Sequence, residues 1–149
     1  MKGGKTFNKV LIILSLLSIF MIAGGVVAWS LNDPCPLRLK QGCFKLETAA
    51  TPESRAKGLG GRDQLPPGNG MLFIHPSPGK HCFWMKDMRF AVDMIWLDAN
   101  KKIVMIKPNA QPDTYPQSFC PDQDSLYVIE LPAGAAEQNQ LTVGNTLML

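Results

Sequence analysis

The apolar and polar positions divide this chain of 149 residues into two parts. Residues 10–29 carry no charge, and 16 of these 20 positions are apolar. After residue 32 the apolar residues form short runs, and all 12 prolines of the chain lie among them. Short apolar runs interrupted by turn-forming residues are typical of β-strands joined by turns. The pattern therefore predicts one long apolar helix followed by a mainly β domain.

Seven short strands are expected in the second part of the chain. They cover residues 43–49, 71–75, 82–86, 91–97, 102–107, 126–131 and 145–149. The runs at 91–97 and 102–107 form the clearest hairpin, because turn-forming residues separate them. Both runs are apolar on both faces, which predicts central strands that are covered on both sides. Residues 76–79 are expected to form a turn, and residues 108–124 a long loop.

Two short helices complete the expected domain. Thr51, Pro52 and Glu53 have the order of a helix start, in which Thr is the N-cap and Pro takes the first helical position. Gly58 is expected to end this helix after about two turns. A second short helix is expected within residues 132–139. Seven strands with two small helices predict a β-barrel or a β-sandwich.

The net charge of +3 arises at the N-terminus alone. Lys2, Lys5 and Lys9 precede every acidic residue, and the chain from residue 32 onward holds 12 basic and 12 acidic residues. A neutral domain argues against nucleic-acid binding, which needs a basic surface facing the phosphates. Lysines ahead of an apolar span instead predict that the N-terminus stays in the cytoplasm while the rest of the chain crosses the membrane.

The apolar span has two interpretations. A helix of 20 residues rises about 30 Å, which matches the hydrocarbon core of a bilayer. We favour an uncleaved single-pass anchor, because the span exceeds the usual core of a signal peptide. The alternative is a signal peptide cleaved after Val26-Val27-Ala28, which would release a secreted protein. The expected order is a basic cytoplasmic segment, a membrane anchor, a connector and an extracytoplasmic domain, over residues 1–9, 10–31, 32–42 and 43–149.

Four cysteines lie beyond the apolar span, at Cys35, Cys43, Cys82 and Cys120. An even number of cysteines outside the cytoplasm predicts two disulfides. Of the three possible pairings we favour Cys35–Cys43, which is local, together with Cys82–Cys120. The second bridge closes a long loop and would stabilise the fold by roughly 4 kcal/mol.

His75 and His81 raise two other possibilities. They could join cysteines in a zinc site, but zinc sites usually contain a C-x-x-C pair and this sequence has none. With Ser77 they have the residue types of a hydrolytic triad, but the sequence lacks the Gly-x-Ser-x-Gly element that presents the nucleophile. Neither a metal nor another cofactor is therefore expected.

Several motifs in fixed order carry a family resemblance. They are Gly-Met-Leu-Phe at 70–73, Phe-Trp-Met-Lys at 83–86, Asp93, and Glu-Leu-Pro-Ala-Gly at 130–134, preceded by Arg-Ala-Lys-Gly-Leu-Gly-Gly-Arg at 55–62. Over residues 43–149 the chain resembles the domain of unknown function 192 family of prokaryotes. The resemblance implies a compact β domain of jelly-roll-like sandwich type that is often exported or membrane-tethered. It implies no activity.

Four charged residues lie beside or within apolar strands, namely Arg62, Lys86, Asp93 and Glu130. A buried charge is unfavourable unless it is paired, so one interpretation is a set of ion pairs that fix the strand register. The other is a polar cluster in a cleft, in which Lys86 and Arg62 bind an anion and Asp93 or Glu130 acts as a base. Trp84 is the aromatic residue expected to line such an opening, because its indole N–H needs a partner.

The expected function is a non-enzymatic binding or interaction module held at the membrane by its N-terminal helix. The alternative is an enzyme that acts on a small polar or anionic ligand through Lys86, Asp93 and Glu130. A third possibility is a structural component of the cell envelope. The partner is expected to be a small molecule or an envelope component, and no nucleic acid is expected.

Overall fold

A curled sheet of six strands forms the framework of residues 35–149, which are the residues that this computed structural model describes. Its strands, in spatial order, are β1 (Leu37–Leu39), β2 (Gly42–Ala49), β3 (Asn69–Gly79), β8 (Ser125–Pro132), β5 (Val92–Leu97) and β6 (Ile103–Ala110). Neighbouring strands are antiparallel except β2 and β3, which are parallel. Two further strands, β4 (Phe83–Trp84) and β7 (Ser118–Phe119), pair only with each other.

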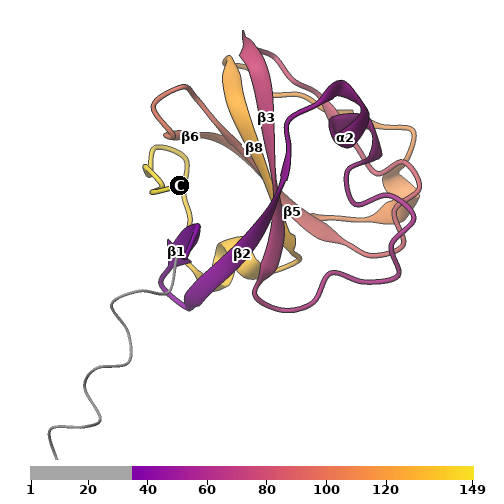
Figure 1. Cartoon of the computed structure of the whole chain (residues 1–149), viewed down its shortest axis with the longest axis horizontal. Coiled ribbons are helices and arrows are strands. Elements are labelled where there is room, and N and C mark those ends of the chain that lie inside the picture. The colour runs from indigo at the N-terminus through magenta and orange to yellow at the C-terminus, as the bar shows by residue number, and fades with distance from the viewer. Residues whose placement is uncertain (1–34) are drawn as a thin grey trace, which may run out of the picture. The chain divides into compact units, whose positions relative to one another are not determined.

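The sheet curls into a half-barrel (Figure 1). Of the two expected architectures, the barrel therefore describes the curvature better, although it is not closed. The jelly-roll-like sandwich implied by the resemblance does not describe this sheet, because the six strands are hydrogen-bonded in one continuous order. The mainly β composition with two short helices is confirmed.

The first helix, α2 (Pro52–Lys57), begins as the sequence predicts. The Thr51 hydroxyl accepts a hydrogen bond from the backbone N–H of Ser54, and the Ser54 hydroxyl accepts one from the N–H of Thr51. Gly58 ends the helix with a positive φ of 49°. A side chain at this position would meet the Phe73 ring at 3.3 Å, so glycine also allows the end of α2 to lie against the sheet.

Side chains alternate between the two faces of the sheet along the central strands. The first face carries Phe73, Met94, Trp96 and Val128, and the segments around Leu59, Met85 and Phe119 cover it. The second face carries Ile95, Leu97, Ile129 and Leu131, and β1, α3 (Ala135–Gln138) and Leu147 cover it. In Figure 1, α2 lies on one side of the sheet, and β1 and the C-terminal segment lie on the other. Because both faces are covered, every residue of β5 is buried.

Both predicted disulfides are confirmed. Cys35 is bonded to Cys43, and Cys82 is bonded to Cys120. The second bridge joins the residue before β4 to the residue after β7, so it fixes the ladder that the two short strands form. The segment 108–124 is therefore not a plain loop: it contains the end of β6, a 3₁₀ turn at Pro112–Thr114 and β7.

Other strand predictions need correction. β3 continues through the expected turn at 76–79, and its prolines lie where the ladder with β8 is interrupted, between Ile74 and Gly79. The predicted strand at 145–149 is reduced to a single bridge between Lys102 and Thr146. β6 forms the predicted hairpin with β5, but it is an edge strand rather than a central one. The C-terminal segment supplies two of its missing hydrogen bonds, at Ile103.

The predicted anchor or signal peptide at 10–31 lies outside the described residues. Within residues 35–149, no helix is long and apolar enough to cross a bilayer.

Candidate functional site

A pocket of about 350 Å³ opens over the first face of the sheet. Its floor comes from the sheet, through Phe73 and His75 of β3 and Glu130 of β8. One wall is the end of α2 with the residues that follow, 55–60, and the other comes from residues 82–88. The residues that build this pocket therefore come from four separate stretches of the chain, 55–60, 73–75, 82–88 and 130.

Glu130 is a buried carboxyl group in this floor, with 4% of its surface exposed. It lies on β8 between Met71 of β3 and Met94 of β5, so its nearest neighbours across the strands are apolar. Its Oε2 atom has no hydrogen-bond partner within the described chain. Burial raises the pKa of Glu130 to about 8. The side chain is therefore an uncharged acid at neutral pH, with one donor and one acceptor.

His75 is the second polar group without a partner, because its buried Nε2 atom forms no hydrogen bond among the described residues. Its ring stacks on that of His81, with centroids 3.5 Å apart and planes inclined by 8°. The pKa of His75 is lowered to about 4, mainly because burial disfavours its charged form. The nearby charges of His81 and Arg55 lower this pKa further. At neutral pH, the imidazole is therefore uncharged as well.

The two groups lie at different ends of the pocket. Glu130 is opposite Met71, and His75 follows Met71 by four residues on the same strand. Four residues of a strand span about 13 Å, and Phe73 lies between the two positions on the same face. Because strand side chains stand roughly perpendicular to the sheet, the two groups address separate parts of a ligand rather than a single reacting atom.

Three cations line the pocket, while Glu130 is the one acidic residue among its lining residues in the described chain. The Arg55 guanidinium is held in place by donating to the carbonyl oxygens of Ala50 and Ile74. Lys57 and Lys86 are exposed and form no ion pair within residues 35–149. With Glu130 uncharged, the field at the opening attracts anions.

Aromatic side chains give the pocket an apolar interior. The Phe83 ring packs edge-on against Phe73 and Trp96, with centroid distances of 4.8 and 5.9 Å. Trp84 is half-exposed at 50% and packs edge-on against Tyr115 at 5.8 Å. Trp84 therefore lines the pocket at its mouth, where its side chain is partly open to solvent.

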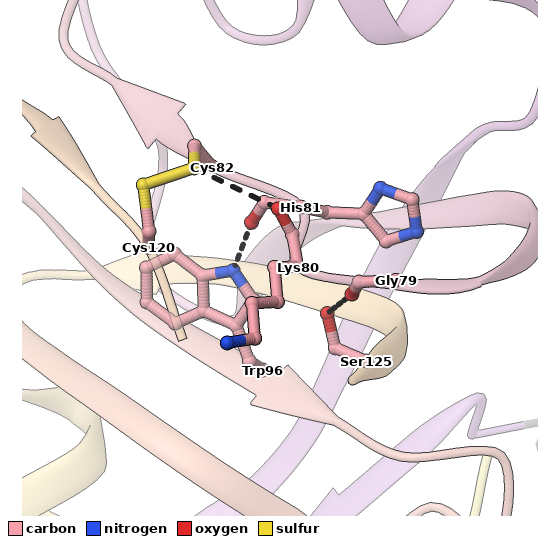
Figure 2. The surroundings of a disulfide bond; sticks show 7 residues. All are labelled: Gly79, Lys80, His81, Cys82, Trp96, Cys120 and Ser125. Atoms are coloured by element: carbon pink, nitrogen blue, oxygen red, sulfur yellow. Dashed lines mark hydrogen bonds between the residues drawn. A yellow bond between two sulfur atoms is a disulfide. The ribbon is translucent and has the colours of Figure 1, made fainter. Parts of the chain in front are cut away.

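The wall that carries Phe83 and Trp84 is fixed at its base (Figure 2). The Trp96 indole N–H donates to the carbonyl oxygen of His81 at 2.7 Å, and the adjacent Cys82 is bonded to Cys120. Nearby, the Ser125 hydroxyl donates to the carbonyl oxygen of Gly79. These contacts tie the start of this wall to β5 and to the segment around Cys120.

The structure brings together three of the five residues expected to form a site, namely Trp84, Lys86 and Glu130. Arg62 lies apart from the pocket, where its guanidinium donates to both carboxylate oxygens of Glu47 at 2.5 and 2.8 Å. The pair raises the pKa of Arg62 and lowers that of Glu47. For Arg62, the ion-pair interpretation therefore describes the geometry.

Asp93 also lies apart from the pocket, because it points to the second face of the sheet. It is fully buried and accepts three backbone N–H groups, from Asn109, Gly134 and Ala136, at 2.8, 3.1 and 2.7 Å. These bonds fix the turn that follows β8. The geometry therefore assigns Asp93 to folding, through hydrogen bonds rather than the ion pair that was considered.

Three polar lining residues, Arg55, Lys57 and His75, were not among the residues expected to form this site, although His75 was considered for a zinc site and a triad. The alternation of Met71, Phe73 and His75 along one strand would have placed the histidine on the buried face. The zinc alternative finds no support, because Cys82 is in a disulfide and residues 35–149 contain no group of three metal-binding side chains.

Comparisons with known proteins agree with this fold. A family model described as DUF192, an uncharacterised family, matches residues 36–149. A solved structure of unknown function from Novosphingobium aromaticivorans is 26% identical, with a TM-score of 0.69, over 76% of this chain and 81% of that one. A second, from Sinorhizobium meliloti and described as a candidate transcription regulator, is 29% identical, with a TM-score of 0.67, over 74% and 88% of the two chains. No curated protein matches.

Proposed function

The chain belongs to the DUF192 family, as its motifs suggested, and from that premise we propose that its β domain binds a small organic anion. The observation that carries the proposal is the composition of the pocket. Two exposed lysines and an anchored arginine line the pocket together with Phe73, Phe83 and the half-exposed Trp84. The volume of about 350 Å³ falls within the range of small-molecule sites.

Binding has more support than catalysis. A general acid and a general base must both reach the reacting atoms. The two unpartnered titratable groups, Glu130 and His75, start about 13 Å apart on the sheet. Asp93, which the enzyme alternative requires, already accepts three backbone N–H groups on the opposite face.

We further propose that this binding occurs outside the cytoplasm, on a domain tethered by residues 10–31. Three lysines ahead of an apolar span support this orientation. The pairing of all four cysteines in disulfides is consistent with an oxidising compartment. We do not extend the description of the Sinorhizobium meliloti protein to this chain, because the balanced charge beyond residue 32 gives no surface suited to phosphates.

The test is calorimetric titration of the full chain, in a mild detergent, with aryl and branched-chain carboxylates, sulfonates and phosphate monoesters. We expect saturable binding of at least one class, and at least tenfold weaker binding by the K57A/K86A variant. The matched control, K45A/K102A, removes two exposed lysines outside the pocket and should change the affinity by less than about twofold. Absence of saturable binding, or equal losses in both variants, would overturn the proposal.

A further inference from the structure

The anion proposal leaves one feature of the pocket unexplained, which is the carboxyl group of Glu130. A methionine would fit between Met71 and Met94 and would need no hydrogen bonds. A buried carboxyl without a partner instead lowers the stability of the sheet. Glu130 also lines the pocket, and its buried Oε2 atom has no hydrogen-bond partner within the described chain.

The charges around the pocket decide which ligand group can meet this carboxyl. A ligand ammonium group would have to pass Arg55, Lys57 and Lys86, which repel it. A second carboxylate would place a net charge in the buried end of the pocket, where charge is unfavourable. An uncharged acceptor avoids both penalties, and it can pair with the hydroxyl of a neutral carboxylic acid.

An amide supplies such an acceptor. Its carbonyl can accept from the hydroxyl of Glu130. Its N–H does not meet the same carboxyl group, because the C=O and N–H of a trans secondary amide point in opposite directions. An apolar side chain of the same ligand would pack against Phe73 and Phe83, and its carboxylate would face Lys57 and Lys86 at the opening.

Building on the proposed function, we infer that the pocket selects organic acids that carry an amide, of the class of N-acylated apolar amino acids. In this assignment Glu130 is the specificity-determining residue that receives the amide. The lysines supply attraction to any anion, whereas Glu130 distinguishes amide-bearing anions from simple ones.

Three congeners test the inference by calorimetric titration of the full chain: N-acetyl-L-phenylalanine, 3-phenylpropanoate and L-phenylalanine. They share the aromatic ring and the carboxylate. The first carries an amide, the second carries no nitrogen, and the third carries an ammonium group. The expected affinity of N-acetyl-L-phenylalanine is at least tenfold higher than that of 3-phenylpropanoate, with L-phenylalanine weakest. The corresponding three compounds derived from leucine and from tryptophan test whether a smaller or a larger side chain fits the pocket better.

Two variants separate recognition from folding. Glu130→Gln keeps one donor and one acceptor, so it should bind the N-acetyl compounds within about threefold of the original protein. Glu130→Met keeps the volume and loses the hydrogen bonds, so its affinity for the N-acetyl compounds should fall at least tenfold. Saturable binding of 3-phenylpropanoate by this variant would show that its pocket is still folded.

A pH series adds an independent readout. Ionisation of Glu130 removes its hydroxyl donor, so N-acetyl-L-phenylalanine should bind more weakly above about pH 8, while Glu130→Gln should show no such decline. The other titratable or charged side chains that line this pocket are Arg55, Lys57, His75 and Lys86. They are present in both proteins, so the difference between the two profiles reports Glu130.

The outcomes distinguish this inference from the proposal beneath it. If no congener binds, the anion proposal fails and this inference fails with it. If 3-phenylpropanoate binds as tightly as N-acetyl-L-phenylalanine, the anion proposal stands and the role of Glu130 is overturned. Retention of full N-acetyl affinity by Glu130→Met would overturn it equally.

Discussion

Glu130 lies directly opposite Met71 in the ladder of β3 and β8, on the buried first face of the sheet. A thioether offers this carboxyl group no useful hydrogen bond, and on the other side it meets a second methionine, Met94. The sheet therefore contains a local defect at the floor of its pocket. Sites where a local rule is broken without compensation within the fold are often functional. Replacing Glu130 by an apolar residue should therefore increase the free energy of unfolding, whereas substitutions at ordinary core positions decrease it.

The first prediction is that Glu130→Met stabilises the protein. It replaces a buried carboxyl that has no partner by an apolar side chain of similar size, and an unsatisfied buried polar group costs about 1–3 kcal/mol. The free energy of unfolding in urea at pH 7 should increase by an amount in this range. A decrease would mean that Glu130 has a stabilising partner in the fold.

The same residue gives the stability a pH dependence. The pKa of Glu130 is about 8 in the folded chain, compared with an ordinary value of 4.5. The native state therefore binds this proton more tightly than the unfolded state, and the free energy of unfolding should fall as the pH rises from about 4.5 to about 8. In Glu130→Gln this decline should be absent, which urea titrations at several pH values would detect. Parallel profiles for the two proteins would contradict the prediction.

His75 should make the stability of the protein depend on pH in the acidic range. Its pKa of about 4 in the folded chain lies below the ordinary value of 6.5, so the unfolded state binds the proton more tightly. The contribution of His75 should leave stability unchanged above about pH 6.5 and reduce it as the pH falls towards 4. A His75→Gln variant should lose less stability than the original protein between pH 6.5 and 4. Equal acid losses, measured by thermal unfolding in matched buffers, would contradict this assignment.

The Arg62–Glu47 pair should contribute little, although it is well formed. Both side chains are partly exposed, and exposed ion pairs typically contribute less than about 1 kcal/mol. Arg62→Ala should therefore lower the free energy of unfolding by less than this amount and leave ligand affinity unchanged. A tenfold loss of affinity would mean that Arg62 reaches the ligand from outside the pocket described above.

Local features of this fold were predictable, whereas most long-range ones were not, the Cys82–Cys120 pairing excepted. The start of α2 depends on Thr51 and Pro52 alone, which are adjacent in sequence. The edge position of β6 depends instead on which strand pairs with it across the sheet. For the site, Asp93 and Glu130 look alike in sequence, since each is an acid within an apolar run. Their surroundings in the fold separate them, because Asp93 accepts backbone N–H groups from Asn109 and the turn at Gly134, whereas Oε2 of Glu130 has no partner within the described chain.

The two disulfides should differ in their contribution. Cys82 and Cys120 are separated by 38 residues, and Cys35 and Cys43 by 8. On the loop-entropy model, loss of the longer bridge costs about 4 kcal/mol and loss of the shorter bridge between 2 and 3, at roughly 25 °C. Urea unfolding of C82S/C120S and C35S/C43S tests this order. The first variant should also weaken ligand binding, since the bridge holds the wall that carries Trp84, whereas the second should not.

Asp93→Asn should destabilise the protein, whereas Glu130→Met should stabilise it. One carboxylate oxygen accepts from Asn109 and Gly134, and the other accepts from Ala136 at 2.7 Å. An asparagine can keep only one of these acceptors and turns an amide donor towards the other N–H. The expected loss is about 2–3 kcal/mol, the range for a hydrogen bond to a buried charged group.

Ligand affinity should not change in the folded Asp93→Asn variant, because Asp93 points away from the pocket. Replacing Asp93, which supports the fold, should thus lower the stability of the protein and leave ligand binding intact. Replacing Glu130 by Met should raise the stability and weaken ligand binding. Urea unfolding and calorimetric titration on both variants would separate the two roles. If Asp93→Asn were as stable as the original protein, or if it lost affinity while remaining folded, Asp93 would have to be returned to the candidate site.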